Sequence, residues 1–153
     1  MRTFADLEEF AAAVGEELGH SDWQEITQEQ VNTFAAATGD HQWIHVDPER
    51  AATESPFGTT IAHGYLTLSL VTTHVAQIFT VDSLTMVVNF GLNKVRFHTP
   101  VAVGAKVRAK AVLTDLKNSP AGKLGTLKVT IEIDGQRRPA CVAEVLALYR
   151  DSA

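Results

Sequence analysis

Apolar residues recur with a helical period in three stretches of the first half of the chain. The first stretch covers residues 4–14. The second begins after Thr27, which opens a capping-box pattern, and Gly39 is placed to end it. The third runs from Gly64 to about Phe79, is almost wholly apolar or small, and has neither proline nor glycine after its first residue. Its length and composition predict a buried helix.

Two shorter elements are predicted between or beside these helices. Residues 21–26 have the composition of a short strand. Asp47 is suited to cap a short helix that has Pro48 in its first turn and ends near Thr53. Helices are therefore expected to dominate the first half of the chain.

The second half is rich in β-branched and apolar residues, which predict four strands: Leu84–Phe97, Lys106–Lys117, Leu124–Asp134 and Ala140–Arg150. Polar residues alternate with apolar ones in the third strand, so one of its faces should meet solvent. Asp134-Gly135 is a hairpin turn signal. The pattern predicts one α+β domain over residues 1–153, with an antiparallel sheet covering one long helix. Such a sheet keeps an open edge, so we expect two copies to pair as a homodimer.

Composition is that of a soluble globular protein, with 45% hydrophobic and 20% charged residues. No uninterrupted apolar run reaches the length of a membrane span, and the first ten residues are acidic where a signal peptide would be apolar. We therefore expect a cytoplasmic protein with no membrane contact. The single cysteine, Cys141, excludes an intrachain disulfide and lies in an apolar run, which favours a buried side chain over a nucleophile.

The net charge of −5 is unevenly distributed. Residues 1–93 carry two basic and thirteen acidic side chains, whereas residues 94–138 carry ten basic and three acidic ones. The overall sign argues against general nucleic-acid binding. The basic segment is suited to an anionic small molecule that carries phosphates, and the alternative is that these side chains are the solvent faces of strands.

The candidate chemistry lies in residues 38–45, where Asp40 and His45 stand five positions apart just after a predicted helix end. Gly64 follows at the start of the apolar helix. Asp and His can share proton transfer, and an N–H at a helix start can stabilise a developing oxyanion. This set suits the addition of water to an activated carbonyl compound, or its removal. The structural alternative is that Asp40 closes an Asx-turn and His45 is a surface loop residue.

For the side chains near Asp40 and His45, the sequence gives less specific predictions. Gln42 either orients a catalytic side chain or satisfies loop backbone, and Trp43 suits packing better than substrate contact. His63 is placed at the helix start, where its ring either bonds to backbone or lies within reach of a substrate. The spacing of His41, His45 and His63 matches no metal-ligand motif, and no glycine-rich nucleotide loop follows a strand. We expect neither a metal nor another cofactor.

Three segments in order, residues 37–47, 61–66 and 93–101, resemble the MaoC-like dehydratases, the hydratase-2 branch of the hot-dog-fold proteins. The first resembles the family pattern Gly-Asp-x-Asn-Pro-aliphatic-His, with Gln42 where Asn is usual and Trp43 where Pro is usual. This variant is more similar to the NodN-like subgroup. The resemblance implies a hot-dog fold, in which an antiparallel sheet wraps around a long central helix.

The resemblance also implies reversible hydration of a trans-2-enoyl thioester to an (R)-3-hydroxyacyl-CoA. Asp40 and His45 would hold the water, with His45 as the base toward it, and the Gly64 N–H would point at the thioester oxygen. Ser69 or Thr72, on the inner face of the long helix, would hydrogen-bond Asp40.

The substrate carrier would be CoA or an acyl-carrier protein, both of them anionic. Lys94 and Arg96 flank Val95 and should share one side of their strand, which makes them the first candidates for binding phosphates. Arg137-Arg138 is the alternative pair. Two other functions stay open, an acyl-CoA thioesterase on the same fold and a non-catalytic acyl-binding module. The pairing of an acid with an imidazole favours the lyase.

Overall fold

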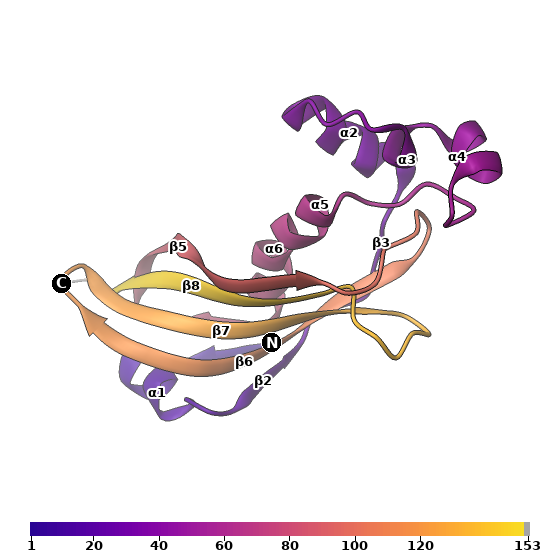
Figure 1. Ribbon diagram of the computed structural model, residues 1–153. Helices are drawn as coiled ribbons and strands as arrows, with labels where there is room; N and C mark the ends of the chain where they lie inside the picture. Colours follow the sequence, from indigo (N-terminus) through magenta and orange to yellow (C-terminus); the bar gives the residue numbers. More distant parts are fainter. Residues whose placement is uncertain (152–153) are drawn as a thin grey trace.

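The architecture of residues 1–151, which the computed structural model describes, is an antiparallel sheet of six strands curved around two helices (Figure 1). The path through the sheet runs β2-β6-β7-β8-β5, and β3 also pairs with β6. The strands are β2 (Glu17–His20), β3 (Gln24–Glu25), β5 (Leu84–Phe97), β6 (Lys106–Ser119), β7 (Gly122–Ile133) and β8 (Cys141–Asp151). The α+β class and the four long predicted strands are confirmed.

Six helices surround the inner face and the ends of this sheet: α1 (Leu7–Ala12), α2 (Gln28–Thr38), α3 (Trp43–Val46), α4 (Pro48–Glu54), α5 (Gly64–Ser69) and α6 (Val71–Ile78). Figure 1 shows α2, α3 and α4 gathered at one end of the molecule and α1 at the other. Within residues 1–151, no helix has the length and apolar character needed to span a membrane.

The predicted start and end of α2 and the predicted start of α4 are confirmed by their capping interactions. The Thr27 side chain accepts a hydrogen bond from the Gln30 N–H at 3.1 Å, which starts α2. Gly39 ends α2 in the left-handed conformation with φ of 81°, where glycine is favoured. Asp47 caps α4 by accepting from the Arg50 N–H. Asp40 therefore leaves a helix end that is fixed by local chemistry.

The long apolar stretch does not form one helix, which corrects the prediction. It forms α5 and α6, separated at Leu70, and the chain then enters a strand, β4 (Phe79–Val81). The Ser69 hydroxyl donates to the Tyr65 carbonyl at 2.6 Å, one turn back. Such bonds bend helices, which accounts for the interruption directly after Ser69.

The N-terminal prediction is also corrected, because residues 2–4 form β1 (Arg2–Phe4) and the helix starts only at Leu7. Strand β1 pairs in parallel with β4, and Phe4 lies opposite Val81. Phe4 is buried against Phe10 and Phe79, so core packing outweighs the helical spacing. The strand predicted over residues 21–26 is reduced to β3, and β2 precedes it.

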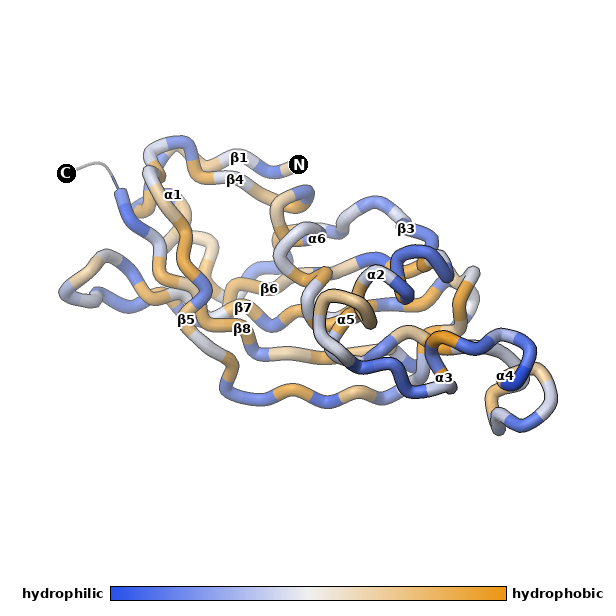
Figure 2. Tube along the Cα trace, turned by 90° about the horizontal axis from the view of Figure 1, so that it is seen from above, coloured by the Kyte–Doolittle hydropathy of each residue, from blue (hydrophilic) through white to orange (hydrophobic). Residues whose placement is uncertain are grey.

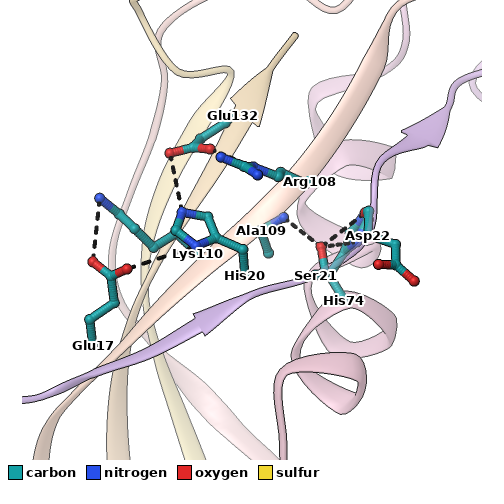
Figure 3. A network of polar contacts seen from close by, with 9 residues as sticks. All are labelled: Glu17, His20, Ser21, Asp22, His74, Arg108, Ala109, Lys110 and Glu132. Atoms are coloured by element: carbon teal, nitrogen blue, oxygen red, sulfur yellow. Dashed lines mark hydrogen bonds and ion pairs between the residues drawn. The ribbon is translucent and has the colours of Figure 1, made fainter. Parts of the chain in front are cut away.

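The core lies between the sheet and helices α1, α5 and α6. Alternate residues of β6 and β7 supply its floor, as the period-2 pattern predicted. Cys141 is fully buried there, and burial raises the pKa of its thiol to about 11, so a structural role is confirmed. A pair of polar side chains is also buried: His74 of α6 contacts Ser21, which in turn accepts from the Ala109 N–H of β6 (Figure 3).

Strand β5 is the long edge of the sheet, opposite the edge formed by the short strands β2 and β3 (Figure 2). It has 14 residues and pairs only with β8 within the part of the chain that the structure describes. Large apolar side chains are exposed along it: Met86, Val87, Val88, Phe90, Leu92 and Phe97. A long apolar edge of this kind favours pairing with another chain.

Candidate functional site

His45 lies on the short helix α3, which the sequence pattern did not predict. Its side chain is only 6% exposed, and Nδ1 donates to the Ile61 carbonyl at 2.7 Å. A carbonyl only accepts, so the proton of the neutral ring is on Nδ1 and Nε2 carries a lone pair. Burial lowers the pKa of His45, against the smaller raising effect of the bond to Ile61. The ring is therefore held neutral, with Nε2 free to accept a proton.

His63 lies directly behind His45. The two imidazole rings stack with centroids 3.9 Å apart and planes 24° apart, and His63 is 2% exposed. Its Nε2 donates to the main-chain carbonyl of Asp40 at 2.9 Å. Its Nδ1 is buried and has no hydrogen-bond partner among residues 1–151. The bond to the Asp40 carbonyl is the backbone contact considered from the sequence for His63, and the burial of the ring does not fit the alternative of a direct substrate contact.

Asp40 is exposed in the loop between α2 and α3. Its Oδ1 accepts from the Gln42 N–H at 3.3 Å, which is the Asx-turn considered as the alternative. This long bond uses one oxygen, so the other lone pairs stay available to a ligand. Asp40, His45 and His63 each offer an atom within 4.8 Å of the others. His41, by contrast, is exposed and outside this cluster.

The arrangement of the cluster favours proton transfer over metal binding. Each imidazole already uses one nitrogen in a hydrogen bond to a carbonyl. The rings are stacked, so their in-plane lone pairs run side by side rather than converging on one point. A metal held by two histidines needs converging lone pairs. The donor geometry therefore does not favour a metal site at these three residues. That the protein binds no metal stays a prediction.

A cavity of about 350 Å³ opens in front of His45. Its lining comes from the segment before α5, from α5 and from the chain around the end of β5: His45, Ile61, Ala62, Gly64, Thr67, Phe97, His98, Thr99, Pro100, Val101 and Ala140. A Cβ on Gly64 would lie 3.3 Å from three atoms of the Phe97 ring. Glycine at position 64 therefore keeps its backbone accessible and leaves room for Phe97.

Gln28 is a site residue that the sequence reasoning missed. Its Nε2 donates to the His45 carbonyl at 2.7 Å, and its Oε1 accepts from the Thr60 hydroxyl at 2.6 Å. Thr60 is buried. Gln28 thus ties the start of α2 to α3 and to the segment before α5. It occupies an ordinary first-turn helix position, and no motif marks it.

Ser69 and Thr72 do not lie as the resemblance implied. Both are exposed, and within residues 1–151 neither has a hydrogen bond to Asp40. The Ser69 hydroxyl is instead used on the Tyr65 carbonyl. Thr67 is the hydroxyl of α5 that is buried and lines the cavity beside His45.

Gln42 and Trp43 lie at the start of α3, on the surface side of the site. Gln42 is exposed at the N-cap position. Trp43 is half-buried, with the Arg50 guanidinium 4.2 Å from its ring centroid, and Arg50 also pairs with Glu54 at 2.9 Å. This cation–π contact supports the packing interpretation of Trp43.

The basic candidates are all exposed. Lys94 and Arg96 stand on β5 just before Phe97, which lines the cavity, and Arg96 donates to the Val95 carbonyl at 2.7 Å. Arg137 and Arg138 lie in the loop between β7 and β8. Both pairs adjoin the cavity, because Arg96 precedes the lining residue Phe97 and the Arg138 carbonyl accepts from the hydroxyl of Thr99, another lining residue, at 3.4 Å.

Known proteins resemble this chain over nearly its whole length. The family model described as a MaoC-like domain matches residues 9–134. The 3-hydroxyacyl-thioester dehydratase Z of Mycobacterium tuberculosis (strain ATCC 25618 / H37Rv) is 53% identical over 150 residues, covering 97% of this chain and 99% of that protein. Nodulation protein N of Rhizobium leguminosarum bv. viciae is 44% identical, covering 94% and 91%. The solved (R)-hydratase from A. caviae has a TM-score of 0.71 at 27% identity, covering 86% of this chain and 96% of that one. The fold is the hot-dog fold expected from the motif resemblance.

Proposed function

The chain belongs to the family of MaoC-like domains, and from this premise we propose that it catalyses the reversible hydration of a trans-2-enoyl thioester to an (R)-3-hydroxyacyl thioester. The observation that carries the proposal is the free Nε2 of a neutral, buried His45 beside Asp40 and in front of a cavity lined by Gly64. The names of the dehydratase relative and of the (R)-hydratase support the same reaction class.

The proposed step adds the elements of water across the double bond. Nε2 of His45 accepts a proton from water as its oxygen bonds to the β-carbon. The proton that His45 has taken up passes to Asp40, and Asp40 delivers it to the α-carbon, so both residues return to their starting state and atoms balance. Negative charge develops on the thioester oxygen, where the Gly64 N–H would donate. Removal of one such donor typically costs about 3 kcal/mol of transition-state stabilisation.

The acyl chain would run along the central helices. A second, mainly apolar cavity of about 410 Å³ lies between α6 and strands β5 and β8. Thr72 lines this cavity and also the neighbouring hollow beside Ser69. These positions suit contact with an acyl chain better than an orienting bond to Asp40. The carrier phosphates would meet Lys94 and Arg96.

We also propose a homodimer formed through β5. The strand offers an unpaired backbone edge and a row of exposed apolar side chains, which a second copy would cover by strand pairing. Phe97, at the end of this row, lines the cavity. Dimerisation would therefore also set the boundary of the site.

A single assay tests the function against its alternative. Purified protein is mixed with crotonyl-CoA while enoyl-thioester absorbance and free thiol are followed together. Loss of absorbance without thiol supports hydration, and thiol release supports the thioesterase. No change in either signal, across short and long acyl chains, would leave only acyl binding.

Variants then test the residues. Asp40→Asn and His45→Gln should each lower kcat by orders of magnitude while the melting temperature changes little. His41→Gln is the matched control, because His41 is exposed and outside the cluster. Near wild-type activity in both site variants would refute the assignment.

A further inference from the structure

We propose that His63 is a positioning residue that assembles the site from behind: its Nε2–H holds the Asp40 main chain while its ring supports the ring of His45. This inference rests on the proposed hydration function. It gives a role to a buried imidazole that does not line the cavity.

The first support is the weak anchoring of Asp40 by other means. Asp40 lies in a loop with no regular structure. Its N–H reaches the Thr38 hydroxyl only at 3.4 Å, and its carboxylate contact with the Gln42 N–H is 3.3 Å long. The bond from His63 to its carbonyl, at 2.9 Å, is shorter than either and has a buried donor. His63 is therefore the firm attachment of this loop to the core.

The second support is the double constraint on His45. The Ile61 carbonyl fixes its Nδ1–H, and the stacked ring of His63 fixes the ring plane. A hydrogen bond alone allows rotation about its axis, whereas the stack removes that freedom. Phe34 contacts His63 in turn, with centroids 4.9 Å apart, so the stack is backed by α2.

One short segment, residues 61–64, thus contacts or supplies each of the proposed catalytic groups. Ile61 orients His45, His63 orients both His45 and Asp40, and Gly64 supplies the oxyanion donor. The segment is itself fixed, because the Ile61 N–H donates to Ile44 at 3.0 Å and the Ala62 N–H donates to Val101 at 2.8 Å. Such fixed geometry is what efficient proton transfer requires, since a misplacement of about 1 Å can cost about 100-fold in rate.

His63 also has an electrostatic effect on His45. Burial lowers the pKa of His45 most, His63 lowers it further, and Asp40 raises it. The titratable groups that face His45 are Asp40 after α2, His63 before α5 and His98 across the cavity. Replacing His63 by a residue that does not titrate removes this lowering effect, so the pKa of His45 should rise and the acid limb of activity should move to higher pH.

Two variants separate the anchor from the stack. His63→Gln keeps an N–H donor near Nε2 but loses the ring, and His63→Phe keeps a stacking ring but loses the donor. We expect kcat to fall about 10- to 100-fold in His63→Phe, with KM changed by less than about threefold, because Asp40 is released. His63→Gln should recover a large part of kcat. In both variants the acid limb of kcat/KM should move to higher pH.

A readout independent of turnover keeps this inference apart from the proposed function. NMR titration of the His45 ring should show a higher pKa in both variants, and the Asp40 amide signal should shift in His63→Phe but much less in His63→Gln. If wild-type protein hydrates no enoyl thioester, the proposed function fails and the NMR result still decides the role of His63. Unchanged kcat and unchanged His45 titration in His63→Phe would overturn the inference, as would equal loss of kcat in the two variants with the Asp40 amide unmoved.

Discussion

Acid should destabilise this fold through His74, a fully buried histidine that the proposed mechanism does not use. Its Nδ1 lies 2.8 Å from the Ser21 hydroxyl oxygen, which also accepts from the Ala109 N–H at 2.9 Å and lies 3.2 Å from the Asp22 carbonyl. These contacts are satisfied together when Nδ1–H donates to Ser21 and Ser21 donates to Asp22. Nε2 then has no proton and, among residues 1–151, no partner. A second proton would place an unpaired charge in the core.

The size of the effect follows from proton linkage. Burial lowers the pKa of His74 from its ordinary value of 6.5, which it keeps in the unfolded chain. Below pH 6.5 the unfolded chain binds a proton that the folded chain does not, so stability is intact above this pH and falls as pH decreases. The unfolded-state value of 6.5 sets the limit of the effect, so the loss from His74 between pH 7.5 and 5.5 is at most about 1.4 kcal/mol. His45 contributes in the same direction, because its pKa is lowered too.

The comparison of wild type with His74→Asn isolates the contribution of His74. The asparagine amide keeps a donor near the position of Nδ1 but does not titrate. Urea unfolding at pH 7.5, 6.5 and 5.5, at one protein concentration, should show that the variant is less stable at pH 7.5 because ring atoms are lost. Its unfolding free energy should then fall less than that of wild type on acidification, with a difference of at most about 1.4 kcal/mol. Parallel pH dependences for the two proteins would refute the reasoning.

Three further predictions concern other parts of the molecule. Gly64→Ala places a Cβ 3.3 Å from the ring of Phe97, which is half exposed and can move aside, so the melting temperature should change little. The methyl group would crowd the N–H that is proposed as the oxyanion donor, so kcat should fall about tenfold or more. Unchanged kinetics would contradict this. Phe90→Lys, at a side chain 64% exposed on the long β5 edge, should convert the proposed dimer to monomer in analytical ultracentrifugation, and an unchanged sedimentation coefficient would count against the β5 interface. Cys141, fully buried with a pKa of about 11, should resist a disulfide reagent at pH 8 until urea is added, and immediate labelling of the native protein would contradict its burial.

The features that the sequence predicted well depend on local chemistry. Thr27, Gly39 and Asp47 are caps whose hydrogen bonds and dihedral angles involve neighbours within four residues. The long strands follow from their β-branched and apolar composition, and in β7 also from an alternation of polar and apolar residues. Phe4 was placed in a helix because it continues a helical spacing, yet it pairs in β1 with Val81. That partner is far away in the sequence, so the pattern carries no trace of it.

The site residues divide in the same way, into those that the local sequence marks and those that depend on distant contacts. Asp40, His45 and Gly64 were marked by motif spacing, and the structure brings them to one end of the central helices. Gln28 was missed because its bonds reach 17 and 32 residues along the chain to His45 and Thr60. Ser69, Thr72 and Thr67 all lie in the apolar helical stretch, where small side chains surround the axis. The periodicity therefore did not tell which hydroxyl turns toward the cavity.

The side chain of Gln28 limits how position 28 can vary. The terminal amide of Gln28 must accept a hydrogen bond from the Thr60 hydroxyl with its oxygen and donate one to the His45 carbonyl with its nitrogen. The side chain must also be long enough to bring this amide to both partners. Asparagine offers the same two ends but is one methylene too short, glutamate offers only acceptors when ionised, and lysine offers only donors. Glutamine is thus the one common side chain with both the length and the polarity. A helix position that looks like free solvent-facing surface in the sequence is, in the folded chain, as restricted in its alternatives as the proposed acid and base themselves.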